Sequence, residues 1–155
     1  MKILMVCLGN ICRSPIAQGV MEQMVREHGL DWNIDSAGTN GFHNGEQPHP
    51  HSIQICKQNG IDISTQTSRR ITLDDLKNYD HILCMAQEVI DQMQTMFGNE
   101  LTNKPIKLLM EFAYPGQKMD IQDPWYGPAS GYGPVFDLIQ QGCEAFIQQQ
   151  STQKP

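Results

Sequence analysis

Apolar residues along the chain occur in two kinds of pattern, which predict strands and helices in alternation. Four short apolar stretches have the length of buried strands: 2–6, 32–37, 80–85 and 106–110. Apolar residues recur at helical spacing in 15–27, 50–59, 87–96 and 134–148, and 72–77 begins as a short capped helix. This alternation predicts an α/β fold, with a parallel sheet covered by helices on both faces. Functional residues are then expected at the carboxyl ends of the strands.

The length and composition are typical of one globular domain. The chain has 155 residues, of which 39% are hydrophobic and 18% charged, and its net charge is −6. We expect a single domain over 1–148, which needs no disulfide or metal for stability, and a disordered polar tail over 149–155. The negative charge and the lack of a basic stripe argue against a nucleic-acid partner.

The distribution of apolar residues and cysteines indicates a cellular compartment. No stretch approaches the roughly 18 apolar residues of a membrane span, and the apolar run at 3–6 is too short for the core of a signal peptide. The five cysteines are odd in number and scattered, which argues against a secreted disulfide scaffold. We therefore expect a cytoplasmic protein with free thiols and no membrane partner.

The residues between the first strand and the first helix have the composition of an anion-binding loop, here called the cradle loop (residues 8–12). The backbone N–H groups of such a loop, together with the N-terminus of the following helix, favour a negatively charged ligand. Gly9 allows a close backbone approach or a positive φ, and Asn10 tolerates a left-handed conformation. Ser14 and Pro15 are the residue types preferred at an N-cap and a first helical position, so we expect the helix to begin there.

Two side chains at the ends of the cradle loop provide the chemistry. The planar guanidinium of Arg13 can bind two phosphoryl oxygens at once. Cys7 lies at the start of the loop, where the helix N-terminus and the nearby cation favour a thiolate. The sequence therefore predicts a phosphate site that contains a nucleophile. The loop is not a Walker motif, because Gly-Lys-Ser/Thr is absent.

The motif and several later segments resemble those of the low-molecular-weight protein tyrosine phosphatases over nearly the whole chain. After Cys7–Pro15, the family's order and spacing are found in Ser36-Ala37-Gly38-Thr39 with Phe42, Arg69-Arg70-Ile71-Thr72, Ile82-Leu83-Cys84-Met85 and Asp123-Pro124-Trp125-Tyr126-Gly127. The resemblance implies a three-layer fold with a four-stranded parallel sheet. It also implies phosphotyrosine-containing proteins as substrates, inorganic phosphate or another oxyanion in the loop, no metal or cofactor, and a monomer or weak dimer.

The resemblance further implies a two-step hydrolysis. Cys7 attacks the phosphorus of an aryl phosphate and forms a cysteinyl-phosphate, while Arg13 and the loop N–H groups stabilise the transition state. Asp123 protonates the leaving phenolate and then activates the hydrolytic water. The sequence also favours Asp123, because Pro124 restricts its backbone to an extended form on a Gly- and Pro-rich loop.

The remaining residues of the expected site bind substrate or support the loop. By resemblance, Ser14 hydrogen-bonds the nucleophile, Asn10 holds the loop, and three aromatic side chains guide the phosphotyrosine ring. The expected substrate-binding set is Leu8, Gly9, Asn10, Ile11, Cys12, Ser14, Phe42, Trp125 and Tyr126.

Two positions depart from the family pattern. Many members carry a histidine at the position of Gln66 and an aspartate at that of Ala86, and both groups help to support the loop. A different network is therefore expected under the cradle loop here. His43, His49 and His51 lie in a segment that Pro48 and Pro50 keep extended, which favours a solvated loop near the site entrance over a metal site.

The cysteines other than Cys7 are expected to protect Cys7 or to pack inside the protein. By resemblance, Cys12 can close a reversible disulfide with Cys7 that protects it from oxidation, and the alternative is a small packing residue. Cys56, Cys84 and Cys143 lie at apolar positions and are expected in the core.

Three alternative functions use the same residues. A thiol-coupled arsenate reductase passes oxidation to downstream cysteines, but Cys84 has no cysteine within the next dozen residues. A phosphoarginine phosphatase is disfavoured because that branch tends to have threonine at the position of Ile11. A non-catalytic phosphopeptide-binding module would not need the complete set of Cys7, Arg13 and Asp123.

Overall fold

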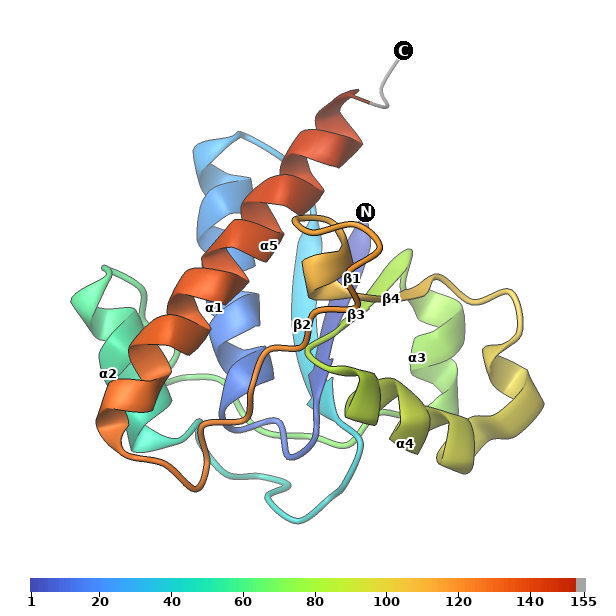
Figure 1. Cartoon of the computed structure of the whole chain (residues 1–155), viewed down its shortest axis with the longest axis horizontal. Coiled ribbons are helices and arrows are strands. Elements are labelled where there is room, and N and C mark those ends of the chain that lie inside the picture. Colours follow the sequence, from blue (N-terminus) through green and yellow to red (C-terminus); the bar gives the residue numbers. More distant parts are fainter. Residues whose placement is uncertain (153–155) are drawn as a thin grey trace.

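Four parallel strands form a sheet between two layers of helices (Figure 1). The computed structural model describes residues 1–152. The strands are β1 (Lys2–Cys7), β2 (Asn33–Gly38), β3 (His81–Cys84) and β4 (Ile106–Leu108), in the order β2-β1-β3-β4. The expected three-layer α/β fold is therefore confirmed. Because β2 and β3 lie on opposite sides of β1, the topological switch point is next to β1, and its carboxyl end is the place where such folds bind ligands.

Alternate residues of β1 enter the two hydrophobic cores of the molecule. Ile3 and Met5 belong to the core on one face of the sheet, and Leu4 and Val6 belong to the core on the other. All four side chains are fully buried, as expected for a central parallel strand covered on both faces.

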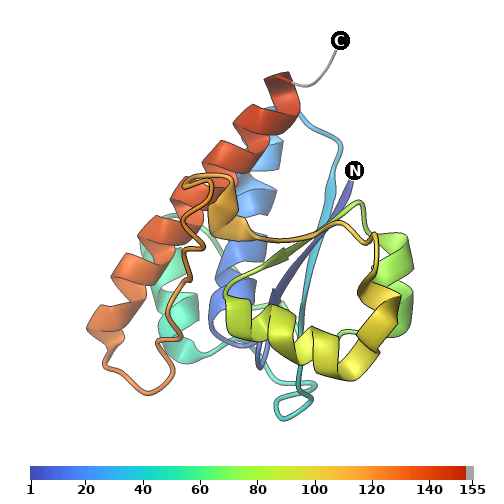
Figure 2. The same ribbon diagram turned by 45° about the vertical axis from the view of Figure 1, so that its right-hand side comes forward.

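Five helices cover the sheet, with α1, α2 and α5 on one face and α3 and α4 on the other (Figures 1 and 2). The helices are α1 (Arg13–Glu27), α2 (Pro50–Gln58), α3 (Leu73–Asn78), α4 (Gln87–Phe97) and α5 (Tyr132–Thr152). Three short 3-10 helices complete the fold: η1 (Gly98–Leu101), η2 (Leu109–Glu111) and η3 (Ala129–Gly131). None of the helices within residues 1–152 is long and apolar enough to cross a membrane.

The start of α1 differs from the prediction. The helix begins at Arg13 with Cys12 in the N-cap position, and no side chain caps it. Ser14 does not act as the N-cap because its hydroxyl is bonded to Cys7 and Asn10. Pro15 is then the third helical residue, which is tolerated because the N–H groups of the first turn have no partner within the helix.

Two other element ends differ from the predictions. The last helix continues to Thr152, so the expected disordered tail is wrong for residues 149–152, and 153–155 lie outside the described residues. The strand predicted over 106–110 ends at Leu108, and the chain turns there into η2.

Candidate active site

The backbone of the cradle loop is held by hydrogen bonds to its carbonyl oxygens. These oxygens, on Leu8, Gly9, Ile11 and Cys12, accept bonds of 2.7–3.1 Å from groups on other segments. The donors are Asn40 N, Ser68 Oγ, His49 N and Ser52 Oγ respectively. Within residues 1–152, none of the backbone hydrogen bonds of loops and turns is donated by residues 8–12. The loop N–H groups are thus available to an anion.

A buried network below the loop connects Asn10 to the thiol of Cys7. Asn10 has φ 57°, and its Nδ2 donates to Ser14 Oγ at 2.8 Å and to Ser36 Oγ at 3.0 Å. The Ser14 oxygen lies 3.0 Å from Cys7 Sγ. Because Ser14 Oγ already accepts a bond from Asn10, its own proton is free to donate to the sulfur.

Arg13 is almost completely buried beside the loop, with 2% of its surface exposed. Its Nη1 donates to the carbonyl of Ile121 at 2.9 Å, and its Nη2 lies 3.6 Å from Asp123 Oδ2. Among the described residues, Nε and Nη2 have no hydrogen-bond acceptor. These two N–H-bearing atoms form the bidentate fork that a phosphoryl group or another oxyanion can complete.

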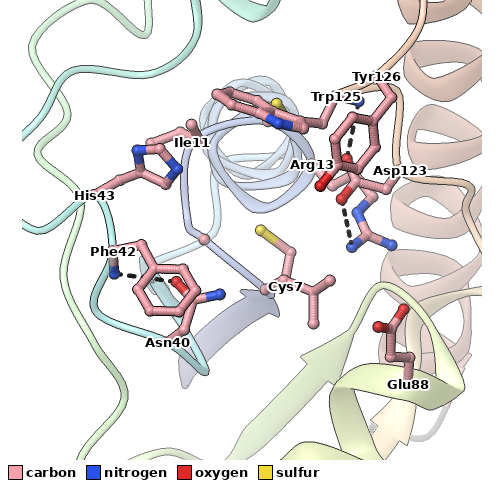
Figure 3. A pocket seen from close by; sticks show the side chains of 13 residues that line it. Cys7, Ile11, Arg13, Asn40, Phe42, His43, Glu88, Asp123, Trp125 and Tyr126 are labelled. Atoms are coloured by element: carbon pink, nitrogen blue, oxygen red, sulfur yellow. Dashed lines mark hydrogen bonds and ion pairs between the residues drawn. The ribbon is translucent and has the colours of Figure 1, made fainter.

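Asp123 lies on the loop that precedes α5, with one third of its side chain exposed. Its Oδ1 accepts a hydrogen bond from the backbone N–H of Trp125 at 3.0 Å, which fixes the carboxylate in a turn. Figure 3 shows Cys7 directing its sulfur into the space between the Phe42 side and the Asp123 side of the pocket. The nucleophile and the carboxylate therefore face one cavity.

This cavity has a volume of about 380 Å³ and aromatic walls. Phe42 and Tyr126 are 83% and 94% exposed, so they form an open apolar mouth instead of packing into the core. Of the expected site residues, only Asn10 and Ser14 are absent from the lining, because they lie buried beneath it. Asn40 and Glu88 also line the pocket and were not predicted from the sequence, whereas His43 was expected only near the site entrance. Asn40 lies two residues before Phe42, and no motif marked Glu88.

The segment that contains His43, His49 and His51 contacts the loop that carries Asp123 (residues 112–128, here called the acid loop) and is not simply solvated as expected. The rings of His43 and His49 both lie 5.3 Å from that of Trp125, and His49 also stacks on Tyr132 at 5.6 Å. His49 Nδ1 accepts a bond from His51 N and caps α2. Burial and the nearby His51 lower the pKa of His49, which favours its neutral, bond-accepting form.

The other cysteines lie in environments that disfavour ionisation. Cys12 Sγ lies 3.5 Å from the Tyr132 hydroxyl, and burial raises its pKa to about 12. Burial also raises the pKa of Cys56 to about 12 and shifts those of Cys84 and Cys143 upward. All three are fully buried, as expected for core residues.

Gln66, at the position where the family resemblance led us to expect a histidine, supports α1. Gln66 Nε2 donates to the carbonyl of Pro15 at 3.0 Å, while its Oε1 has no partner among the described residues. The segment after it holds the loop: Arg69 N donates to Asn10 Oδ1, and the Arg69 guanidinium forms ion pairs with Asp35 and Asp75. This ion-pair network was not predicted from the sequence.

Comparisons with known proteins agree with this geometry. The sequence matches the family described as "Low molecular weight phosphotyrosine protein phosphatase" over residues 2–155. It is 34% identical to the low molecular weight protein-tyrosine-phosphatase YfkJ of Bacillus subtilis over 148 residues, 94% of this chain and 93% of that protein. It is also 34% identical to the human low molecular weight phosphotyrosine protein phosphatase, over 95% of this chain and 94% of that protein.

Solved structures show the same similarity. The crystal structure of YfkJ matches with a TM-score of 0.91 and 32% identity, over 100% of this chain and 97% of that chain. A Drosophila arginine phosphatase matches with a TM-score of 0.90 and 30% identity, over 99% and 100% of the two chains. The chain belongs to the low molecular weight phosphotyrosine protein phosphatase family and is a phosphatase of that family.

Proposed function

We propose that this phosphatase hydrolyses aryl phosphates, and specifically phosphotyrosine in proteins. The observation that carries the proposal is the combination of an oxyanion site around Cys7 with exposed aromatic side chains at the mouth of the same pocket. A phosphotyrosine ring can lie between Phe42 and Tyr126 while its phosphoryl group reaches the loop. Aromatic pairs of this kind contribute about 0.5–1.5 kcal/mol each beyond the area that they bury.

The first chemical step transfers the phosphoryl group to the protein. The Cys7 thiolate attacks phosphorus, so that an S–P bond forms and the bond from phosphorus to the phenolic oxygen breaks. Asp123, in its acid form, gives its proton to the leaving oxygen. Arg13 and the N–H groups of the cradle loop bind the equatorial oxygens and stabilise the charge of the transition state.

The second step restores the enzyme. Asp123, now a carboxylate, accepts a proton from a water molecule, and that water attacks the phosphorus of the cysteinyl-phosphate. The S–P bond breaks, inorganic phosphate forms and Cys7 returns to a thiolate. The hydrogen bond from Ser14 stabilises Cys7 as the leaving group of this step.

A phosphoarginine phosphatase is the second candidate, because two of the similar solved structures are arginine phosphatases. Ile11 favours the aryl ester, because an apolar side chain lines the pocket at the position where the arginine-specific branch tends to have threonine. The thiol and carboxylate chemistry would be the same for both substrates, so only the walls of the pocket distinguish them.

The test is a comparison of kcat/KM for three peptides of one sequence that carry phosphotyrosine, phosphoarginine or phosphoserine. We expect phosphotyrosine to exceed the other two by about ten-fold or more, the equivalent of one or two aromatic contacts. Phe42→Ala should reduce the rate on phosphotyrosine and leave that on phosphoserine unchanged. Leu73→Ala, which removes an exposed apolar side chain outside the pocket, is the matched control. Equal rates on the three peptides, or a preference for phosphoarginine, would overturn the proposal.

A further inference from the structure

The N-terminus of α4 is capped by a residue of the acid loop. Ala86 occupies the N-cap position and has no side-chain acceptor for the first N–H groups of the helix. Asp120 provides one instead, since its Oδ1 accepts a hydrogen bond from Gln87 N at 2.9 Å across 33 positions of sequence. A carboxylate at this end of a helix also interacts favourably with the helix dipole.

The bond of Asp120 is the first of a series that leads to Asp123. The next residue, Ile121, is fully buried, and its N–H donates to the carbonyl of Met85 at 2.9 Å. Its own carbonyl accepts the 2.9 Å bond from Arg13, whose Nη2 faces Asp123. The backbone of 120–123 is thus held between the start of α4 on one side and the buried arginine on the other.

The segment itself contains no helix or strand. Among the described residues, 112–128 lie outside every helix and strand, and Figures 1 and 2 show the segment running along α5 toward the carboxyl ends of the strands. Its position therefore depends on packing of Ile121 and Met119 against the core and on a few hydrogen bonds. Asp120 supplies the bond that joins it to α4, only three residues before Asp123.

We propose that Asp120 is a positioning residue, which aligns Asp123 with the leaving oxygen by fixing the acid loop to the N-terminus of α4. The proposal rests on the proposed role of Asp123 as general acid. A carboxyl group that donates a proton must lie within hydrogen-bond distance of its acceptor, so a small displacement of the loop reduces the rate of proton transfer. Binding of the phosphoryl group does not involve Asp120, because the cradle loop is held by other bonds.

The test compares Asp120→Ala with Asp120→Asn on two aryl phosphates. Asp120→Ala should lower kcat/KM on phenyl phosphate, which reports the first step alone, by about ten-fold, because a misaligned acid loses part of the 10²- to 10⁴-fold that proton donation contributes. The loss should be smaller on 4-nitrophenyl phosphate, whose leaving group needs less protonation, and inhibition by inorganic phosphate should be unchanged. Asp120→Asn retains an acceptor for Gln87 N and should stay within about two-fold of the native rate. An equal loss on both esters would contradict the proposal.

A double variant separates positioning from helix capping. Ala86→Ser combined with Asp120→Ala supplies a cap on the helix itself without joining the acid loop to it. We expect this variant to regain thermal stability and to keep the leaving-group-dependent loss in kcat/KM. Recovery of kcat/KM together with stability would show that Asp120 acts only as a cap. Asp62→Ala is the matched control, because Asp62 is an exposed aspartate that accepts a bond from Ser64 N in a remote turn.

The outcome also distinguishes this proposal from the proposed function. If Asp123→Ala shows no greater loss on phenyl phosphate than on 4-nitrophenyl phosphate, Asp123 is not the general acid and both proposals are wrong. If Asp123→Ala shows that difference and Asp120→Ala does not, only the positioning role is wrong.

Discussion

At the scale of single residues, Arg13 is the side chain whose environment is least complete without a ligand. It is 2% exposed, donates one hydrogen bond to Ile121 O, and has two nitrogen atoms without an acceptor in the described residues. A buried charge with unsatisfied donors costs the fold several kcal/mol unless a partner compensates it. The phosphoryl group of the substrate is such a partner, so the buried arginine is best explained by binding of an oxyanion.

Asp123 provides a direct test at the same scale. Asp123→Ala should lower kcat on phenyl phosphate at its optimal pH by about 10²- to 10⁴-fold, the usual contribution of a general acid. Asp123→Asn is the matched control for shape, because it can still accept the bond from Trp125 N but has no acidic proton. Both variants should lose activity alike if protonation is the function of Asp123. Native activity in either variant would mean that another group protonates the leaving oxygen.

At the scale of elements, the cradle loop depends on a close contact with the end of β2. A Cβ atom added to Gly38 would lie 2.6 Å from the carbonyl oxygen of Leu8 and 3.0 Å from Asn10 N. No side chain can move away to relieve this contact, because both atoms belong to the backbone of the loop. The glycine is therefore required for the loop to reach its observed position.

Gly38→Ala should displace the loop and reduce both activity and stability. We expect kcat/KM on phosphotyrosine to fall by about ten-fold or more, and the free energy of unfolding to fall by about 1–3 kcal/mol, the usual cost of overpacking. Gly133→Ala is the control, because a Cβ at Gly133 of α5 would meet nothing within 4 Å. Steady-state kinetics and urea unfolding of both variants provide the measurement. Native kcat/KM in Gly38→Ala would show that the loop tolerates displacement.

The elements also show how far the sequence alone can predict this structure. Hydrophobic periodicity predicted the strands and helices, because burial on two faces requires it, and the motif around Cys7 and Arg13 predicted the loop. The sequence could not predict that Ser14 would bond to Cys7 instead of capping α1, because both roles suit a serine. Nor could the sequence identify Asp120 as the cap of α4, since the two segments meet only in the folded chain.

At the scale of the whole molecule, the pocket joins segments from most of the chain. Its lining extends from Cys7 to Tyr126 and is supported by bonds from α2 and from residues 68–69. A ligand in this pocket binds only the folded state, so it should stabilise the entire domain. The unfolding temperature is therefore a measure of oxyanion binding that does not depend on catalysis.

Inorganic phosphate should raise the unfolding temperature of the native protein. At a concentration about 100 times its Kd, the stabilisation is about 2.7 kcal/mol, or roughly 5–10 °C for a domain of this size. Arg13→Gln should abolish the increase, whereas Arg26→Gln, which changes an exposed arginine on the same helix, should retain it. An equal increase in both variants would place the phosphate outside the cradle loop.

The central claim is that Cys7 receives the phosphoryl group from phosphotyrosine, and trapping of the intermediate tests it most directly. The protein is mixed with a phosphotyrosine peptide, quenched in acid within milliseconds and digested for mass spectrometry. We expect one phosphoryl group on the fragment that contains Cys7, with a burst of free tyrosine peptide, and neither signal in Cys7→Ala. A phosphoryl group on another residue, or tyrosine release by Cys7→Ala at the native rate, would contradict the account.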